Sequence, residues 1–162
     1  TMRPTPPDTP PKLERYFTYR LNTLSKLNDL ASHSLYLSQG GLTLSESRAM
    51  ASIGSFPQIT VNQLAFEANL DKGQASRAAQ SLVDKGLVIK THNLVDGRSV
   101  ILALAPKGKP VWRKLMALME QRNQALMRCL TPEEQTQLIG LFERMLAQAK
   151  AEHAGHSEPE AT

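Results

Sequence analysis

The chain lacks the features that mark secreted, membrane-embedded or disulfide-bonded proteins. Its 162 residues include a single cysteine, Cys129, and only 5% aromatic residues. One cysteine cannot form an internal disulfide, which fits a reducing compartment. The sequence has no apolar run of about 18 residues and nothing that resembles a signal peptide. We therefore expect a soluble, cytoplasmic protein with no membrane partner.

Motifs that carry catalysis are missing as well. The chain has no glycine-rich phosphate loop, no G-x-S-x-G, no H-E-x-x-H and no paired metal-ligand cluster. His153 and His156 are spaced like metal ligands, but they fall in the polar segment 151–162, which we expect to be a disordered tail. The sequence predicts no enzyme, no metal site and no cofactor.

Positive charge is concentrated before this tail. The chain carries 19 basic and 15 acidic residues, a net charge of +4. Three of the acidic residues, Glu152, Glu158 and Glu160, lie after Lys150, so the rest of the chain has a net charge of +7. This balance favours a polyanionic partner.

The N-terminal part divides into an arm and a helix. Five prolines between residues 4 and 11 predict that segment 1–11 is a disordered, extended arm. Segment 12–40 is then expected to be helical, with apolar residues on more than one face. A helix that is apolar over so wide an arc must be covered from two sides.

Segment 41–105 contains the most informative pattern. Thr43-Leu44-Ser45-Glu46, Thr60-Val61-Asn62-Gln63 and Asp71-Lys72-Gly73-Gln74 each match a capping box that begins a helix. The last two helices are separated by a turn of only a few residues, and Gly86 supplies the left-handed residue that ends the second. These are the marks of a helix-turn-helix.

Two strands follow it. Residues 87–92 and 99–104 are rich in β-branched side chains and bracket the loop 93–98, which predicts a wing. Pro106 is then expected to be the first residue of a long helix, and Thr131-Pro132-Glu133-Glu134 to cap a last one. The apolar stripes of segment 106–150 are too extensive for a small winged-helix core, so we expect terminal helices from two chains to pack as a homodimer. The predicted fold class is mainly α with a small β-wing.

The order of these elements resembles the MarR family of bacterial transcription regulators from Lys12 to Lys150. The matching residues are Leu64-Ala65, Ser76-Arg77, Gly86-Leu87-Val88 and Asp96-Gly97-Arg98. The chain departs from the family's L-T-x-x-G pattern, because it reads Leu104-Ala105-Pro106-Lys107-Gly108. The resemblance implies a dimeric regulator, usually a repressor, whose binding to double-stranded DNA changes when a small molecule, often a phenolic or aromatic acid, binds. Two recognition helices per dimer predict an inverted-repeat operator.

Recognition helices contact base edges mainly through their N-terminal half. The candidate DNA-binding residues in the second motif helix are therefore Lys72, Gly73, Gln74, Ser76, Arg77 and Gln80. Arg77 pairs naturally with guanine and Gln74 with adenine, whereas Lys72, Ser76 and the Gly73 N–H suit phosphates. The alternative is that this is the solvated face of a surface helix.

The wing supplies further candidates. Arg98 could enter the minor groove, directed by a pairing with Asp96, while Lys90, Thr91 and His92 could contact phosphates. A purely structural turn is the alternative. A winged helix that binds only another protein is a second reading of the whole motif, and it predicts no salt-dependent affinity for DNA.

Sensing could involve the first helix or the cysteine. Tyr16, Tyr19, Arg20 and His33 lie on or near the first helix and would suit an aromatic carboxylate. Interface packing of the tyrosines, with Arg20 in an ion pair, explains them equally well. Cys129 lies on the apolar stripe of the long helix, where we expect a buried core residue, and a redox-sensing thiol is the alternative.

Overall fold

The computed structural model describes residues 9–92 and 99–156. They form two compact units, one ending at Arg122 and the other beginning at Asn123. In chain order the elements are η1 (Leu13–Arg15), α1 (Phe17–Leu35), η2 (Tyr36–Gly40), α2 (Leu44–Ser55), β1 (Ile59–Thr60), α3 (Val61–Glu67), α4 (Lys72–Asp84), β2 (Val88–His92), β3 (Val100–Leu104), α5 (Gly108–Met127) and α6 (Pro132–His156). None of the helices in these ranges combines the length and apolarity needed to cross a membrane.

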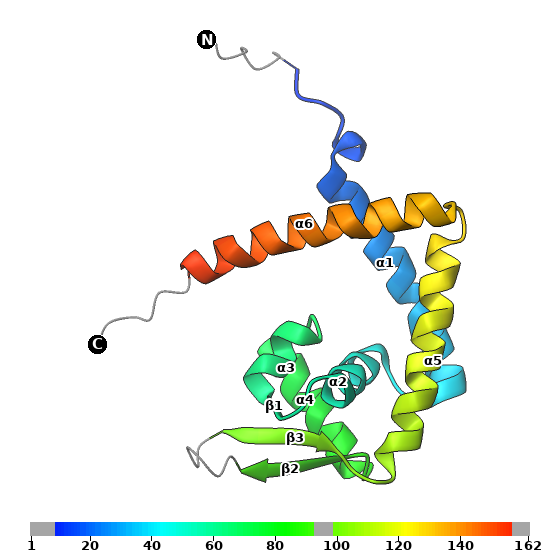
Figure 1. The fold of residues 1–162 in the computed structure, drawn as a ribbon. Coiled ribbons are helices and arrows are strands. Elements are labelled where there is room, and N and C mark those ends of the chain that lie inside the picture. Colours follow the sequence, from blue (N-terminus) through cyan, green and yellow to red (C-terminus); the bar gives the residue numbers. More distant parts are fainter. Residues whose placement is uncertain (1–8, 93–98, 157–162) are drawn as a thin grey trace. The chain divides into compact units, whose positions relative to one another are not determined.

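The predicted helix-turn-helix and wing strands are present (Figure 1). All three capping boxes of segment 41–105 form with both reciprocal hydrogen bonds. Asn69 takes the left-handed conformation (φ 54°) in the turn between α3 and α4, and Gly86 (φ 73°) ends α4. The capping box of the last helix also forms, between Thr131 and Glu134.

The sheet has one strand more than expected. β3 lies in the centre and pairs antiparallel with β2 on one side and with the two-residue β1 on the other. In the register, Ile59 is opposite Leu102 and Val88 is opposite Leu104. The sequence does not predict β1, because two residues are too few to show the alternation of a strand. Its second residue, Thr60, is also the N-cap of α3.

One hydrophobic core holds the winged helix together. Its fully buried large side chains are Met50, Ile59, Leu64, Leu82, Leu102 and Leu115. They come from α2, the sheet, α3, α4 and α5, so these elements place their apolar faces in the same core. The alanines predicted to face inward from α4, Ala75, Ala78 and Ala79, are buried as expected.

Two boundaries differ from the predictions. α5 begins at Gly108 rather than at Pro106, because the Ala105 N–H still donates to the Leu87 carbonyl (2.9 Å) and extends the sheet by one bond. α6 continues to His156 rather than ending at Lys150, because Ala151 and Ala154 favour helix and no proline intervenes. Segment 151–156 is therefore helical and not a disordered tail. The expected disorder of 1–8 and 157–162 concerns segments that lie outside the described residues.

The same carbonyl of Leu87 makes Gly108 necessary. A Cβ on Gly108 would overlap this oxygen, which is fixed by its hydrogen bond to Ala105. We expect Gly108→Ala to destabilise the protein by about 1 to 3 kcal/mol, as overpacking does. Urea unfolding followed by circular dichroism measures this. Gly155→Ala is the control, because nothing lies within 4 Å of the added carbon; equal stability of the two variants would contradict the prediction.

Candidate nucleic-acid interface

α4 presents a polar face and a buried face. All six DNA-binding candidates on this helix are exposed, whereas Ala75, Ala78, Ala79 and Leu82 are buried. Because the buried side is built from small residues, α4 lies close to α2 and α3 and keeps its other side toward solvent (Figure 1). This arrangement provides a continuous polar surface for a partner.

Arg77 and Gly73 are neighbours on that surface. A Cβ on Gly73 would lie 3.1 Å from one terminal nitrogen of Arg77, so the guanidinium extends back toward the first turn of α4. This is the part of a recognition helix that meets base edges. The glycine therefore gives the arginine room as well as offering its own N–H.

Gln74 is already engaged within the helix. Its Oε1 accepts a hydrogen bond from the Asp71 N–H (3.2 Å), and the Asp71 carboxylate accepts one from the Gln74 N–H (2.7 Å). Bidentate pairing with adenine uses the amide oxygen and nitrogen together. Gln74 would have to weaken its capping bond to read a base in this way, whereas Arg77 meets no such competition from the cap.

Gln80 connects α4 to the wing. Its Oε1 accepts from the Lys90 ammonium of β2 (2.7 Å), and its Nε2 donates to the Asp84 carboxylate (2.8 Å). Two predicted contacts, Gln80 and Lys90, are therefore brought together and bound to each other. His92 is exposed at the end of β2, opposite Val100. Asp96 and Arg98, the predicted wing-tip contacts, lie outside the described residues.

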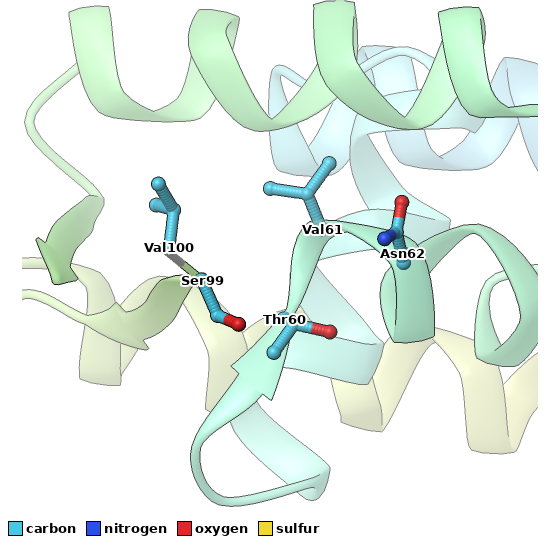
Figure 2. A pocket seen from close by; sticks show the side chains of 5 residues that line it. All are labelled: Thr60, Val61, Asn62, Ser99 and Val100. Carbon is cyan, nitrogen blue, oxygen red and sulfur yellow. The ribbon is translucent and has the colours of Figure 1, made fainter. Parts of the chain in front are cut away.

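A hollow of about 420 Å³ lies between the start of α3 and the base of the wing. It is lined by Thr60, Val61, Asn62, Ser99 and Val100 (Figure 2). The polar groups come from both the first motif helix and the wing strand. The lining includes no aromatic side chain and none of the four predicted effector contacts, so this hollow does not fit the expected aromatic ligand.

The predicted effector residues do not share one site within the chain. Tyr16 is extended and precedes α1, and Tyr19 and Arg20 are exposed on the first turn of that helix. His33 lines a separate hollow of about 490 Å³ with Lys26 and Asp29. Along a helix Arg20 and His33 are about 20 Å apart, too far for one small aromatic acid. Within one chain, Tyr16, Tyr19 and Arg20 are therefore separated from His33, and binding of an effector by these residues stays a prediction.

Cys129 does not lie on α5 as expected. The helix ends at Met127, and the cysteine lies in the connection to α6, where it is exposed. The expectation of a buried core residue is thus wrong for the single chain, because α5 ends one turn earlier than its apolar pattern indicated.

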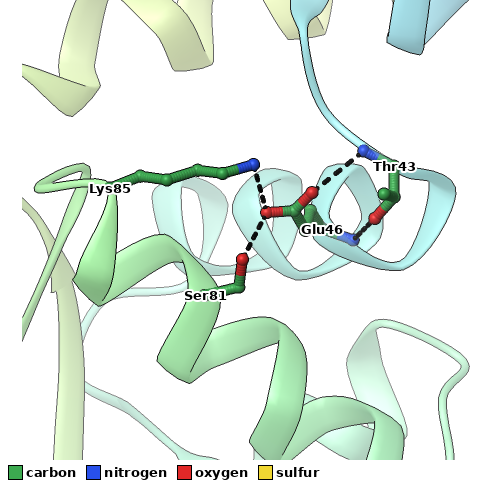
Figure 3. Close-up of polar contacts among 4 residues, drawn as sticks. All are labelled: Thr43, Glu46, Ser81 and Lys85. Atoms are coloured by element: carbon green, nitrogen blue, oxygen red, sulfur yellow. Dashed lines mark hydrogen bonds and ion pairs between the residues drawn. The ribbon is translucent and has the colours of Figure 1, made fainter.

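A group of polar contacts that no sequence pattern fully indicates lies beside the interface. Glu46 is its centre, with a side chain only 7% exposed. Its Oε1 accepts from the Thr43 N–H (3.1 Å), and its Oε2 accepts from the Ser81 hydroxyl and the Lys85 ammonium, both at 2.7 Å (Figure 3). The capping box predicted the first contact. The other two join α2 to α4 across 35 and 39 residues, and no local pattern indicates them.

These contacts determine the charge of Glu46. Burial alone would raise the pKa of its carboxyl group, but hydrogen bonds from Lys85, Ser81 and the Thr43 N–H, together with the Lys85 charge, outweigh burial and lower the pKa. The carboxylate is therefore ionised at neutral pH while buried between two helices.

Comparisons with known proteins agree with this architecture. A model of the MarR family matches residues 40–99. The HTH-type transcriptional regulator BilQ of Clostridium symbiosum is 27% identical over 109 residues, which are 67% of this chain and 76% of that protein. A MarR-family transcriptional regulator from Silicibacter pomeroyi superposes with a TM-score of 0.73 at 26% identity, over 85% of this chain and 92% of that chain.

A third similar structure is BpsR of Bordetella bronchiseptica, whose DNA binding is regulated by 6-hydroxynicotinic acid. Its TM-score is 0.73 at 16% identity, over 85% of this chain and 97% of that chain, which is a similarity of fold.

The capped helices, the buried alanine face of α4 and the β2–β3 hairpin define a winged helix-turn-helix protein. Residues 40–99 match the MarR family, and the chain is similar to transcriptional regulators of that family. BilQ and the Silicibacter protein are both transcriptional regulators.

The lowered pKa of Glu46 predicts how its contribution to stability depends on pH. A carboxyl whose pKa is lower in the folded than in the unfolded state stabilises the fold above the unfolded value, here about 4.5, and ceases to do so as pH falls through the folded value. Glu46→Gln should therefore cost about 1 to 2 kcal/mol at pH 7 and less at pH 3. Urea unfolding at both pH values measures the difference.

Glu134→Gln is the matched control. Glu134 caps α6 by the same pair of hydrogen bonds but forms no ion pair with any residue that the structure describes. A cost of Glu46→Gln that stays constant from pH 7 to pH 3 would contradict the ion-pair interpretation.

Proposed function

We propose that the protein is a homodimeric transcriptional repressor that reads an inverted-repeat operator with α4. The observation that carries this proposal is the polar face of α4, which the buried alanines hold away from the core. Arg77 is the expected base reader, and Lys72, Ser76 and the Gly73 N–H are expected to hold phosphates. The positive charge of the chain outside 151–162 supports a polyanionic partner.

Exposed apolar side chains support a dimer. On α1 they include Phe17, Leu24, Leu27 and Leu30, and on α6 they include Ile139, Leu141, Met145 and Leu146; each is between 46% and 65% exposed in the single chain. Large apolar side chains repeated along two helices favour burial against a second chain. A dimer would present two recognition helices, which is why we expect an operator with two inverted half-sites about 10 base pairs apart.

Arg77→Ala tests specific reading. An operator is first obtained by selection from a random duplex library, and affinities for it and for a scrambled duplex are measured by fluorescence anisotropy. We expect the variant to lose about 1 to 3 kcal/mol on the operator and much less on the scrambled duplex, since a bidentate base contact carries sequence information. Lys72→Ala is the comparison, with about equal losses on both duplexes.

Two outcomes would contradict the proposal. Equal losses for Arg77→Ala on both duplexes would make Arg77 a phosphate contact only. Failure of the wild type to select any duplex, with no steep decrease in affinity as salt is raised, would favour a winged helix that binds only protein. A selected site without two half-sites would argue against a dimeric reader.

We further propose that a small aromatic carboxylate binds against α1 and releases the operator. Tyr16, Tyr19 and Arg20 lie on one short stretch, with the Arg20 N–H donating to the Tyr16 carbonyl (3.2 Å). Arg20 forms no ion pair within the described part of the chain, so its guanidinium is available for a carboxylate. All three side chains are exposed, so a closed site would need a second wall from the partner chain. Regulation of BpsR by 6-hydroxynicotinic acid, an aromatic acid, supports this chemistry for a protein of the same fold.

Thermal-shift measurements with a panel of aromatic acids test the effector proposal. We expect an acid that raises the Tm of the wild type by several degrees and has no effect on Arg20→Ala. Lys26→Ala is the matched variant, because Lys26 lines the other hollow on α1 and should leave the shift unchanged. Loss of the shift in Lys26→Ala alone would move the site to the hollow at His33.

A further inference from the structure

We propose that Glu46 is a positioning residue that fixes the rotation of α4 about its own axis and thereby sets the sequence specificity of DNA binding. The inference rests on the proposed function, in which α4 reads the operator. Glu46 lies in the first turn of α2 and does not belong to the polar face of α4. It acts through Ser81 and Lys85.

The geometry of the contact is suited to this role. Ser81 of α4 and Lys85, the C-cap residue of that helix, are one turn apart, so their side chains lie on the same side of the helix. Both reach one carboxylate oxygen at 2.7 Å, while the other oxygen is held by the Thr43 N–H. A carboxylate fixed at both oxygens cannot follow the helix if α4 rotates. Rotation would break two charge-assisted bonds at once.

Arg77 lies one turn before Ser81 on the same helix. The Glu46 side chain, Arg77, Gln74 and Ser81 line one hollow of about 360 Å³ between the start of α2 and α4. Any rotation at Ser81 is therefore transmitted to Arg77, because both belong to one rigid helix. Recognition sites require their side chains to be held within about 10 to 20° of the productive geometry.

The apolar part of the contact between α2 and α4 is less directional than the hydrogen bonds of Glu46. The buried residues of α4 are mainly alanines, whose short side chains permit sliding and turning with small changes in packing. Directional hydrogen bonds to a buried charge do not permit this. Glu46 is also the only charged residue that is buried among those the structure describes, so the arrangement costs desolvation that a simple packing contact would avoid.

Glu46→Gln is the test variant. Glutamine can still accept the Thr43 capping bond with its single amide oxygen, as Gln63 and Gln74 do in their own capping boxes. Its amide nitrogen then replaces the oxygen that accepts from Ser81 and Lys85, and it can accept from neither. Affinities for the selected operator and for a scrambled duplex are measured at a temperature at which circular dichroism shows every variant to be fully folded. We expect the ratio of the two affinities to decrease about threefold to thirtyfold, mainly through the operator.

Three further variants complete the design. Ser81→Ala removes one donor at little cost to folding and should lower the ratio in the same direction. Lys85→Met should lower it too, and the double variant Glu46→Gln/Lys85→Met should lose less than the two single variants combined, since both changes remove the same pair. Glu134→Gln, the equivalent capping variant in α6, should leave the ratio unchanged.

Each result has a distinct meaning. If the wild type does not discriminate between the two duplexes, the proposed function fails and not the role of Glu46. If the wild type discriminates and Glu46→Gln lowers only the Tm, Glu46 is merely structural and the inference is overturned. If Lys85→Met weakens both duplexes equally and reduces the dependence on salt, Lys85 is a phosphate contact, which also overturns it.

Discussion

The close approach of α4 to α2 is the constraint on which the rest of the winged helix depends. Ala75, Ala78 and Ala79 allow it, because a larger side chain at any of these positions would push α4 away from the core. The same packing leaves the other side of α4 exposed and polar. Contacts between small apolar residues are not directional, however. The hydrogen bonds that Glu46 accepts from Ser81 and Lys85 are directional and orient α4 relative to α2.

Several side chains of the polar face are already hydrogen-bonded without DNA. Gln74 belongs to the cap of α4, and Gln80 joins Lys90 of the wing strand to Asp84. These contacts orient the surface before a partner arrives, which reduces the conformational entropy lost on binding. They must also be exchanged if the same groups are to contact bases or phosphates. Arg77 takes part in neither the cap nor the connection to the wing, and it is therefore the most available of the expected base readers.

α2 connects three parts of the first unit. Arg48 of α2 pairs with Asp29 of α1 at 2.6 Å, and Glu46 of the same helix holds α4. On α5 the Trp112 indole donates to the Ala51 carbonyl of α2 (3.3 Å) and packs over Gly54, where a Cβ would overlap the ring. A displacement of α1 would therefore reach α4 through a single helix. α1, which carries exposed apolar side chains, is thus connected to the recognition helix through the contacts of α2.

The sequence predicted the elements whose signals are local. A capping box joins residues three apart, and the left-handed Gly86 acts on its own turn, so the helix starts, the helix-turn-helix and the wing strands could be inferred without a structure. Boundaries were less secure. The start of α5 depends on a bond between Ala105 and Leu87, and the exposure of Cys129 depends on where α5 ends.

In the candidate site, too, some features follow from local sequence and others from contacts between distant elements. The residues that α4 exposes follow from local sequence, because helical period and the choice of alanine fix the two faces of that helix. The contacts of Gln80 with Lys90 and of Glu46 with Ser81 and Lys85 depend instead on the packing of separate elements. These partners lie on different elements, and Glu46 is 35 and 39 residues from its partners on α4. Their meeting depends on how the helices pack, which no local pattern of residues encodes.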